Sequence, residues 1–299
     1  MRSFSFLVNP LSGGGAAPAA VVPVARLLRE AGAEVEVTYS PGPNATLDLV
    51  KAGVDRGDVI VAVGGDGMLS SIAGQVSQLG GVLGMVPAGR GNDFARMLKL
   101  SDEPDEIAKT LLAGTETPTD LIMITLPGGE PRLVAGSVYS GVDARAGEIV
   151  DKVRWMPAKL QYPYASIHAL ATYVPSRFEV VVDGARHSYL AATVVVANSG
   201  YYGKGMHIAP EASVTDGVLD VIVIEASSRR EMMKALPKVY DGGHVLLDQV
   251  KVLKGTMVEI SGTPTVPMGG DGEPLGMLPT DASGPAVIRV LPGILNILI

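Results

Sequence analysis

The chain has 299 residues, a formal net charge of −7 and no cysteine, with 47% hydrophobic and 5% aromatic residues. This length suits one large domain or two smaller ones with an aliphatic core, and the acidic balance argues against nucleic-acid binding across the whole surface. The lack of cysteine excludes disulfides, thiolate catalysis and cysteine-based zinc sites. No apolar run approaches the ~20 residues of a membrane span, and the four histidines lack metal-ligand spacing.

Strand and helix patterns alternate in the first part of the chain. Strands are expected at 3–8, 35–39, 59–63 and 82–86, with helical spacing at 21–32, at 46–52 and after Gly67. The run at 59–63 is apolar throughout, which is typical of a strand buried on both faces. The alternation predicts a parallel sheet with helices on both faces.

The pattern changes after residue 112. Strands are expected at 119–126, 132–139, 177–182, 189–198, 218–224, 250–253, 256–261 and 287–291, with only two helical segments, at 164–173 and 228–240. Val182-Asp183-Gly184 is typical of a hairpin turn, and successive strands of this kind predict an antiparallel β-sandwich. We therefore expect two domains, 1–125 and 126–291, with a cleft between them.

Three glycine-rich loops, at 9–15, 64–67 and 89–93, follow strands of the first domain. Parallel sheets bind ligands at the carboxyl ends of their strands, and amides at a helix start favour phosphate. Asp66 suits a phosphate-bound Mg²⁺, although an N-cap aspartate in a plain turn is an open alternative. The sequence has neither a Walker phosphate loop nor a serine-hydrolase elbow.

The remaining candidates for chemistry are carboxylates. Asp66, Asp93 and Asp120 follow or flank strand ends of the first domain, and four more lie in the segments 215–220 and 270–274. These four are Asp216, Asp220, Asp271 and Glu273. An Asp-Gly pair is most often a turn, so each pair taken singly also fits a purely structural role.

Taken in order, the motifs resemble those of bacterial diacylglycerol kinase-like lipid kinases over nearly the whole chain. The motifs are Asn9-Pro10-x-Ser12-Gly13-Gly14, Gly64-Gly65-Asp66-Gly67, Gly89-Arg90-Gly91-Asn92-Asp93-Phe94-Ala95, Asn198-Ser199-Gly200-Tyr201-Tyr202-Gly203-x-Gly205-Met206 with Ala209-Pro210, Asp216-Gly217-x-Leu219-Asp220 and Asp271-Gly272-Glu273-Pro274. Gly-Gly-Asp-Gly is shared with NAD kinases, so an NAD kinase stays as an alternative.

This resemblance implies an α/β N-terminal domain of the NAD kinase/diacylglycerol kinase type, to which residues 292–299 return, and an antiparallel β-sandwich C-terminal domain. It implies ATP- and Mg²⁺-dependent transfer of the γ-phosphoryl group to a hydroxyl of diacylglycerol or a related lipid. The residues implied to bind the nucleotide are Asn9, Ser40, Gly64, Gly65, Asp66, Gly67, Met68, Leu69, Ser70, Arg90 and Asn92.

The resemblance also assigns the acidic residues. Glu273 would be the base that orients the acceptor hydroxyl, with Asp271 as its close neighbour. Asp66, Asp93 and Asp120 would hold Mg²⁺ near the phosphates, partly through water. A second, structural Mg²⁺ would be bound by the side chain of Asp216 and the backbone oxygens of Ser213 and Val218.

Two departures from the family pattern motivate another hypothesis. Met68, Ser70 and Ser71 stand where the family usually has Thr, Asn and Glu, and Ser40 lies one residue from the position of a usual threonine. A hydroxyl and a carboxylate near the nucleotide are thereby lost. A catalytically silent lipid- or nucleotide-binding protein on the same fold is therefore an alternative to the enzyme.

The resemblance implies a cytoplasmic protein, peripheral to the inner face of the membrane, that meets its lipid substrate there and binds no nucleic acid. One segment mixes basic and aromatic groups that would suit an interface: Lys152, Arg154, Trp155, Met156, Lys159, Tyr162 and Tyr164. A half-buried helix with its loop explains this segment slightly better. The acceptor lipid and the oligomeric state, a homodimer included, stay open.

Overall fold

The computed structural model describes residues 2–40, 43–89, 91–153 and 155–299. Its first part contains four strands that pair in parallel in the order β4-β3-β1-β2, which confirms the predicted parallel sheet. These strands are β1 (Ser3–Val8), β2 (Glu34–Tyr39), β3 (Val59–Gly64) and β4 (Val82–Pro87).

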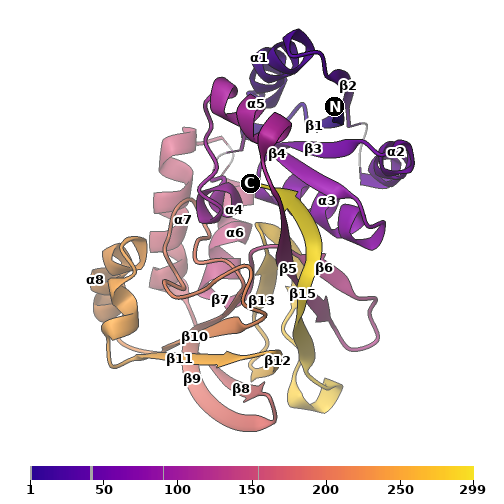
Figure 1. Ribbon diagram of the computed structural model, residues 1–299. Coiled ribbons are helices and arrows are strands. Elements are labelled where there is room, and N and C mark those ends of the chain that lie inside the picture. The colour runs from indigo at the N-terminus through magenta and orange to yellow at the C-terminus, as the bar shows by residue number, and fades with distance from the viewer. Residues whose placement is uncertain (1, 41–42, 90, 154) are drawn as a thin grey trace.

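Helices cover both faces of this sheet (Figure 1). In β3, Val61 and Val63 pack with α1 (Ala17–Glu30) and α5 (Pro104–Ala113) on one face. Ile60 and Ala62 pack on the other face with α2 (Pro43–Arg56), α3 (Asp66–Gln78) and α4 (Asp93–Met97). A strand with cores on both sides must be apolar at every position, as this run is.

The second part is an antiparallel sheet that folds around an aliphatic core, with Phe178 and Val194 among its fully buried side chains. The predicted hairpin turn at Asp183-Gly184 is confirmed, because Val182 pairs with Ala185 across it. The strands are β5 (Glu116–Thr125), β6 (Arg132–Val134), β7 (Ser137–Gly141), β8 (Ser176–Val182), β9 (Ala185–Ala197), β10 (Leu219–Glu225), β11 (Val250–Gly255), β12 (Met257–Thr263), β13 (Pro267–Gly270), β14 (Glu273–Met277) and β15 (Ala286–Leu298).

Among the described residues of the second part, three α-helices rather than the expected two cover this sheet: α6 (Val142–Lys152), α7 (Ala158–Thr172) and α8 (Arg229–Tyr240). The prediction missed α6, although Val142, Ala146 and Ile149 recur at helical spacing along its buried face. The prediction of a single strand at 132–139 is also wrong, because Ala135 and Gly136 interrupt it and separate β6 from β7. β13 and β14 were not expected, since their glycines and prolines disfavour strands.

The two parts are joined through β15, which pairs antiparallel with β5 and β12 and then in parallel with β4 at Asn296 and Ile297. The C-terminus consequently lies beside the parallel sheet (Figure 1). Within the described residues, none of the helices is both long and apolar enough to cross a bilayer.

Candidate active site

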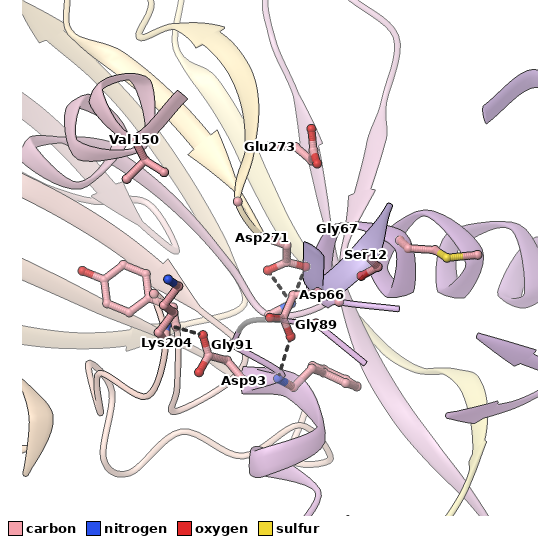
Figure 2. Close-up of a pocket in the computed structure, with 18 of the residues that line it drawn as sticks. Ser12, Asp66, Gly67, Gly89, Gly91, Asp93, Val150, Lys204, Asp271 and Glu273 are labelled. Carbon is pink, nitrogen blue, oxygen red and sulfur yellow. Dashed lines mark hydrogen bonds between the residues drawn. The ribbon is translucent and has the colours of Figure 1, made fainter. Parts of the chain in front are cut away.

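A cleft of about 550 Å³ lies between the two parts of the chain. Each of the three glycine-rich loops contributes to it, through residues that include Asn9, Asp66 and Gly89. The second part contributes α7, the 201–204 segment and the turn at 271–273. The carboxyl ends of β1, β3 and β4 therefore meet at one cavity, as expected for a parallel sheet (Figure 2).

The glycine-rich loops pack backbone against backbone. A Cβ atom at Gly65 would lie 3.1 Å from the Cα of Gly89, so neither loop has room for a side chain at this crossing. Asn92, in a left-handed conformation, fixes the loop at 89–93 by accepting the amide of Gly89 at 2.8 Å. Asn9 similarly fixes the first loop by accepting the amide of Leu11 at 3.0 Å.

Two carboxylates meet beside the loop after β4. A Cβ atom at Gly91 would lie 3.1 Å from an Oδ2 of both Asp66 and Asp93, so the two side chains flank the same point. Burial raises the pKa of Asp66, against the opposing effect of amide donors such as that of Phe94. Burial and the charge of Asp66 together raise the pKa of Asp93 to about 6.

Asp93 also connects the two parts of the chain. Its carboxylate accepts the backbone amides of Lys204 at 2.8 Å and Gly205 at 2.7 Å, which anchors the loop that follows β9 (Figure 2). The Nζ atom of Lys204 lies 3.9 Å from the ring centroid of Tyr162 on α7. A cation of the second part thus stands at the same cleft as the two carboxylates.

Asp271 occupies a two-residue turn with Gly272 between β13 and β14, and both residues have the positive φ that such a turn requires. Its carboxylate accepts the amides of Ala135, Gly136 and Ser137 at 2.8 to 3.1 Å. These hydrogen bonds explain why the strand is interrupted between β6 and β7: the amides there bind Asp271 instead of a neighbouring strand. Burial raises the pKa of Asp271, and these amide donors oppose that rise. The carboxylate of Asp271 therefore binds backbone amides and holds the turn between β13 and β14 against the segment that joins β6 to β7.

Ser70, where the family usually has asparagine, takes part in the same arrangement. Its hydroxyl accepts the amide of Ala135 at 3.1 Å and hydrogen-bonds to Asp271. Met68 lines the cleft, with its Sδ atom 3.0 Å from where a Cβ of Gly64 would stand. Ser71 is exposed on the outer side of α3.

Glu273 is the first residue of β14, and its exposed side chain reaches across the cleft to the first turn of α3. A Cβ atom at Gly67 would lie 2.8 Å from its Oε1 atom. The side chain therefore stands at the N-terminus of a 13-residue helix, where amides and the helix dipole favour anionic groups.

Several residues expected at the nucleotide lie elsewhere. The side chain of Leu69 is buried in the core of the first part, since it faces the sheet from α3. Ser40 follows the edge strand β2 and hydrogen-bonds to Thr46, and it does not line the cleft. Gly64 lines only a small adjoining pocket. Arg90 lies outside the described residues.

Asp120 does not line the cleft that Asp66 and Asp93 share, so the expected use of all three carboxylates for Mg²⁺ stays a prediction. Its two oxygens accept the amides of Gly217 and Gly293, each at 2.7 Å, and it does not line the cleft. In the described part of the chain no three acidic or histidine side chains gather as a metal site.

Gly217 belongs to the loop in which a structural Mg²⁺ was expected. There, the Asp216 side chain accepts the amide of Val218 at 3.0 Å, and the Ser213 hydroxyl accepts the amide of Thr215 at 3.4 Å. The loop thus closes on its own hydrogen bonds and on Asp120.

A second, mostly apolar pocket of about 100 Å³ adjoins the cleft, and Tyr162, Tyr202 and Gly203 line both cavities. It lies beneath α6, α7 and α8, among side chains such as Leu170 and Leu236. Sequence reasoning missed this pocket, because apolar side chains that line a cavity have the same pattern as those that fill a core.

Buried polar groups lie where the two cavities meet. Asp143 of α6 accepts the hydroxyl of Thr193 at 2.6 Å and bonds to Tyr202, and burial raises its pKa. The hydroxyl of Tyr139 accepts the amide of Gly272 at 3.1 Å, and its ring meets that of Tyr202 edge to face. Tyr202 belongs to the motif that begins at Asn198, but no short motif marks Tyr139, Asp143 or Thr193, so only the fold reveals those three.

Comparison with known proteins identifies the arrangement. The family model of the YegS C-terminal NAD kinase beta sandwich-like domain matches residues 136–299, and that of the diacylglycerol kinase catalytic domain matches residues 3–124. The chain belongs to the bacterial diacylglycerol kinase-like lipid kinases. It is therefore an enzyme, a lipid kinase, and the predicted resemblance and fold class are confirmed.

Individual relatives agree with this family. A diacylglycerol kinase of Mycobacterium tuberculosis is 29% identical over 95% of this lipid kinase and 93% of its own length. A diacylglycerol kinase of Bacillus subtilis is 25% identical over 93% and 92%. The crystal structure of a diacylglycerol kinase from Bacillus anthracis superposes with a TM-score of 0.73 at 18% identity, over 99% of this chain and 96% of its own.

Proposed function

We propose that this lipid kinase transfers the γ-phosphoryl group of ATP, with Mg²⁺, to a hydroxyl of diacylglycerol or a closely related lipid. The observation that carries the proposal is the position of Glu273, which reaches the first turn of α3 from the opposite side of the cleft. Relatives named diacylglycerol kinase, matched over nearly their full length, support the acceptor.

In this proposal the nucleotide phosphates lie against the glycine-rich loops and the N-terminus of α3. At the crossing of Gly65 and Gly89, no side chain stands between the backbone of the two loops and a bulky anion in the cleft. Lys204, also at the cleft, supplies a positive charge to the transferring group.

The residues fit a divalent cation in one place. Asp66 and Asp93 present hard oxygen donors on two sides of Gly91, and the raised pKa of Asp93 reflects their mutual repulsion as well as burial. A Mg²⁺ ion held there would relieve this repulsion and neutralise phosphate charge. The family's structural site at Asp216 stays a prediction.

The acceptor lipid would place its hydroxyl beside Glu273 and a hydrocarbon chain in the apolar pocket. Tyr162, Tyr202 and Gly203 line both cavities, so a single molecule could extend from one into the other. Glu273 would accept the proton of the attacking hydroxyl, and its exposed position leaves space for that group.

The test is transfer of labelled γ-phosphate from ATP, with Mg²⁺, to a panel of lipid alcohols in mixed micelles, and to NAD. Glu273→Gln should lower the rate by about 10²- to 10⁴-fold, since it removes the base and preserves the shape. Glu130→Gln, an exposed glutamate away from the cleft, is the matched control and should keep the wild-type rate.

The outcomes separate the alternatives. Label on diacylglycerol that Glu273→Gln abolishes would support the acceptor and the base together. Label on NAD would replace the proposal with an NAD kinase. ATP binding without transfer to any acceptor would favour a catalytically silent binding protein. The departures from the family pattern at Met68, Ser70 and Ser71 are the reason for considering that alternative.

A further inference from the structure

Helix α7 carries apolar side chains on its outer face. Leu160 and Ile167 are 54% and 52% exposed, and they lie on the same side of the helix because they are seven residues apart. Ala165 and Ala169 on the opposite side are buried against the protein. The outer face of a helix in a globular protein is normally polar, so this stripe is unusual.

The residue Trp155 extends this apolar surface. It lies in the turn between α6 and α7, is 82% exposed, and is the single tryptophan of the chain. Large aromatic side chains are costly to leave in water, and tryptophan is favoured where an apolar medium meets water. The segment predicted from sequence is thereby revised, because Tyr162 instead turns into the cleft towards Lys204.

Helix α8 packs beside α7 and contributes positive charge. Arg230, Lys234 and Lys238 recur at four-residue intervals on its exposed side, and Arg229 precedes them. The only acidic residue in this helix, Glu231, is engaged by Ser228 in a capping box, and the nearby charge of Lys234 also favours its ionised form. Among the described residues, none of these four basic side chains has an acidic partner within ion-pair distance.

This cationic and apolar surface covers the apolar pocket. Leu170 of α7 and Met232 and Val239 of α8 line that pocket from the inner sides of the same helices. Figure 1 shows α7 and α8 on one side of the molecule, away from α2. The positive charge is local, since the whole chain carries a net charge of −7.

We propose that the α7–α8 surface, defined by Trp155, Leu160, Ile167, Arg230, Lys234 and Lys238, docks on an anionic lipid bilayer. The basic side chains would contact headgroup phosphates while the apolar ones enter the interface. The inference rests on the proposed lipid acceptor. Docking through this face would place the apolar pocket next to the membrane in which that lipid lies.

The single tryptophan provides a specific assay for docking of the full chain. Emission of Trp155 is recorded as vesicles of phosphatidylglycerol and phosphatidylcholine are added, with pure phosphatidylcholine vesicles in parallel. A blue shift with the anionic vesicles alone, weakened by added salt and quenched by brominated acyl chains, is expected.

Charge-reversal variants locate the surface. Arg230→Glu with Lys234→Glu should weaken binding to the anionic vesicles by about 30-fold or more, since each basic residue near a membrane is worth about 1 kcal/mol. Lys51→Glu with Lys109→Glu makes the same charge change at exposed sites on α2 and α5, and should retain most of the binding. Ile167→Ser should weaken binding through its lost apolar contact.

Turnover of a dispersed, short-chain diacylglycerol separates this inference from the proposed function. Both double variants should keep the wild-type rate on that substrate. Failure of the wild type to bind anionic vesicles, or equal loss of binding in the two double variants, would overturn the docking surface. Docking as expected without phosphorylation of any lipid would instead overturn the function and leave the surface in place.

Discussion

The carboxylate of Glu273 on β14 lies against Gly67 in the first turn of α3, so that a Cβ atom at Gly67 would stand 2.8 Å from its Oε1 atom. The two residues come from the two parts of the chain, and β13–β14 is held there by the amides that Asp271 accepts. The proposed base is therefore positioned by backbone packing across the cleft.

Gly67→Ala tests this contact. The added methyl group must displace the end of a flexible side chain, so the fold should persist with Tm changed by only a few degrees. Displacement of a catalytic group by about 1 Å is expected to lower kcat by about 10- to 100-fold. Steady-state kinetics and thermal unfolding measure the two effects. Gly129→Ala, where a Cβ would make ordinary contacts, is the control, and a wild-type kcat in Gly67→Ala would contradict the assigned position.

The hydroxyl of Tyr139 supports the same hairpin by accepting the amide of Gly272. Tyr139→Phe should lower kcat by about tenfold with KM for ATP and lipid unchanged, because the turn before Glu273 loses an anchor. The free energy of unfolding should fall by only about 1 kcal/mol. Tyr189→Phe, on β9 outside the cleft, should change neither quantity. An equal loss in both variants would refute this role.

Asp93 should make stability depend on pH. Its pKa is about 6 in the folded protein, against a reference value of 3.8. The folded state therefore binds more protons than the unfolded state between these values, and the free energy of unfolding falls as pH rises through this window. Asp93→Asn should reduce that slope by up to ~1.4 kcal/mol per pH unit. Urea denaturation from pH 4 to 7 measures the free energy of unfolding at each pH. The same dependence on pH in the wild type and in Asp93→Asn would count against the assigned pKa.

Mg²⁺ should stabilise the wild type more than Asp93→Asn. The ion would relieve the repulsion between Asp66 and Asp93, which the neutral amide no longer produces. Thermal unfolding at neutral pH with and without Mg²⁺, in the absence of nucleotide, compares the two proteins. Asp48→Asn, at an exposed site on α2 away from the cleft, should respond to Mg²⁺ as the wild type does. Identical shifts in all three would remove the ion from Asp93.

The apolar pocket should determine how the enzyme responds to chain length. Ala146 of α6 lines this pocket, and Ala146→Phe would fill part of it. KM for long-chain diacylglycerol should rise by at least about tenfold, with a smaller rise for short chains, while KM for ATP stays constant. Ala52→Phe, at an exposed site on α2, is the matched control. The same KM change for every chain length would place the hydrocarbon chain elsewhere.

The local pattern of apolar, polar and glycine residues predicted much of the fold but not all of it. β3 is apolar at every position because both of its faces are covered, so its burial could be read from sequence. The break at Ala135 and Gly136 could not, because the acceptor of their amides is Asp271, 136 residues away from Ala135. Similarly, Leu69 lies two residues after the glycine-rich loop at 64–67 but faces the core, since helix phase decides where its side chain points.

The sequence by itself determined the alternation of strands and helices in the first part, the three glycine-rich loops and the acidic motif at 271–274, because each depends on residues close together in the chain. The tertiary structure alone decided that Asp93 accepts the amide of Lys204, that Asp120 accepts the amides of Gly217 and Gly293 and does not line the cleft, and that α8 packs beside α7. Those relations join residues brought together by sheet pairing and helix packing, and such long-range contacts leave no periodicity in the sequence that would reveal them.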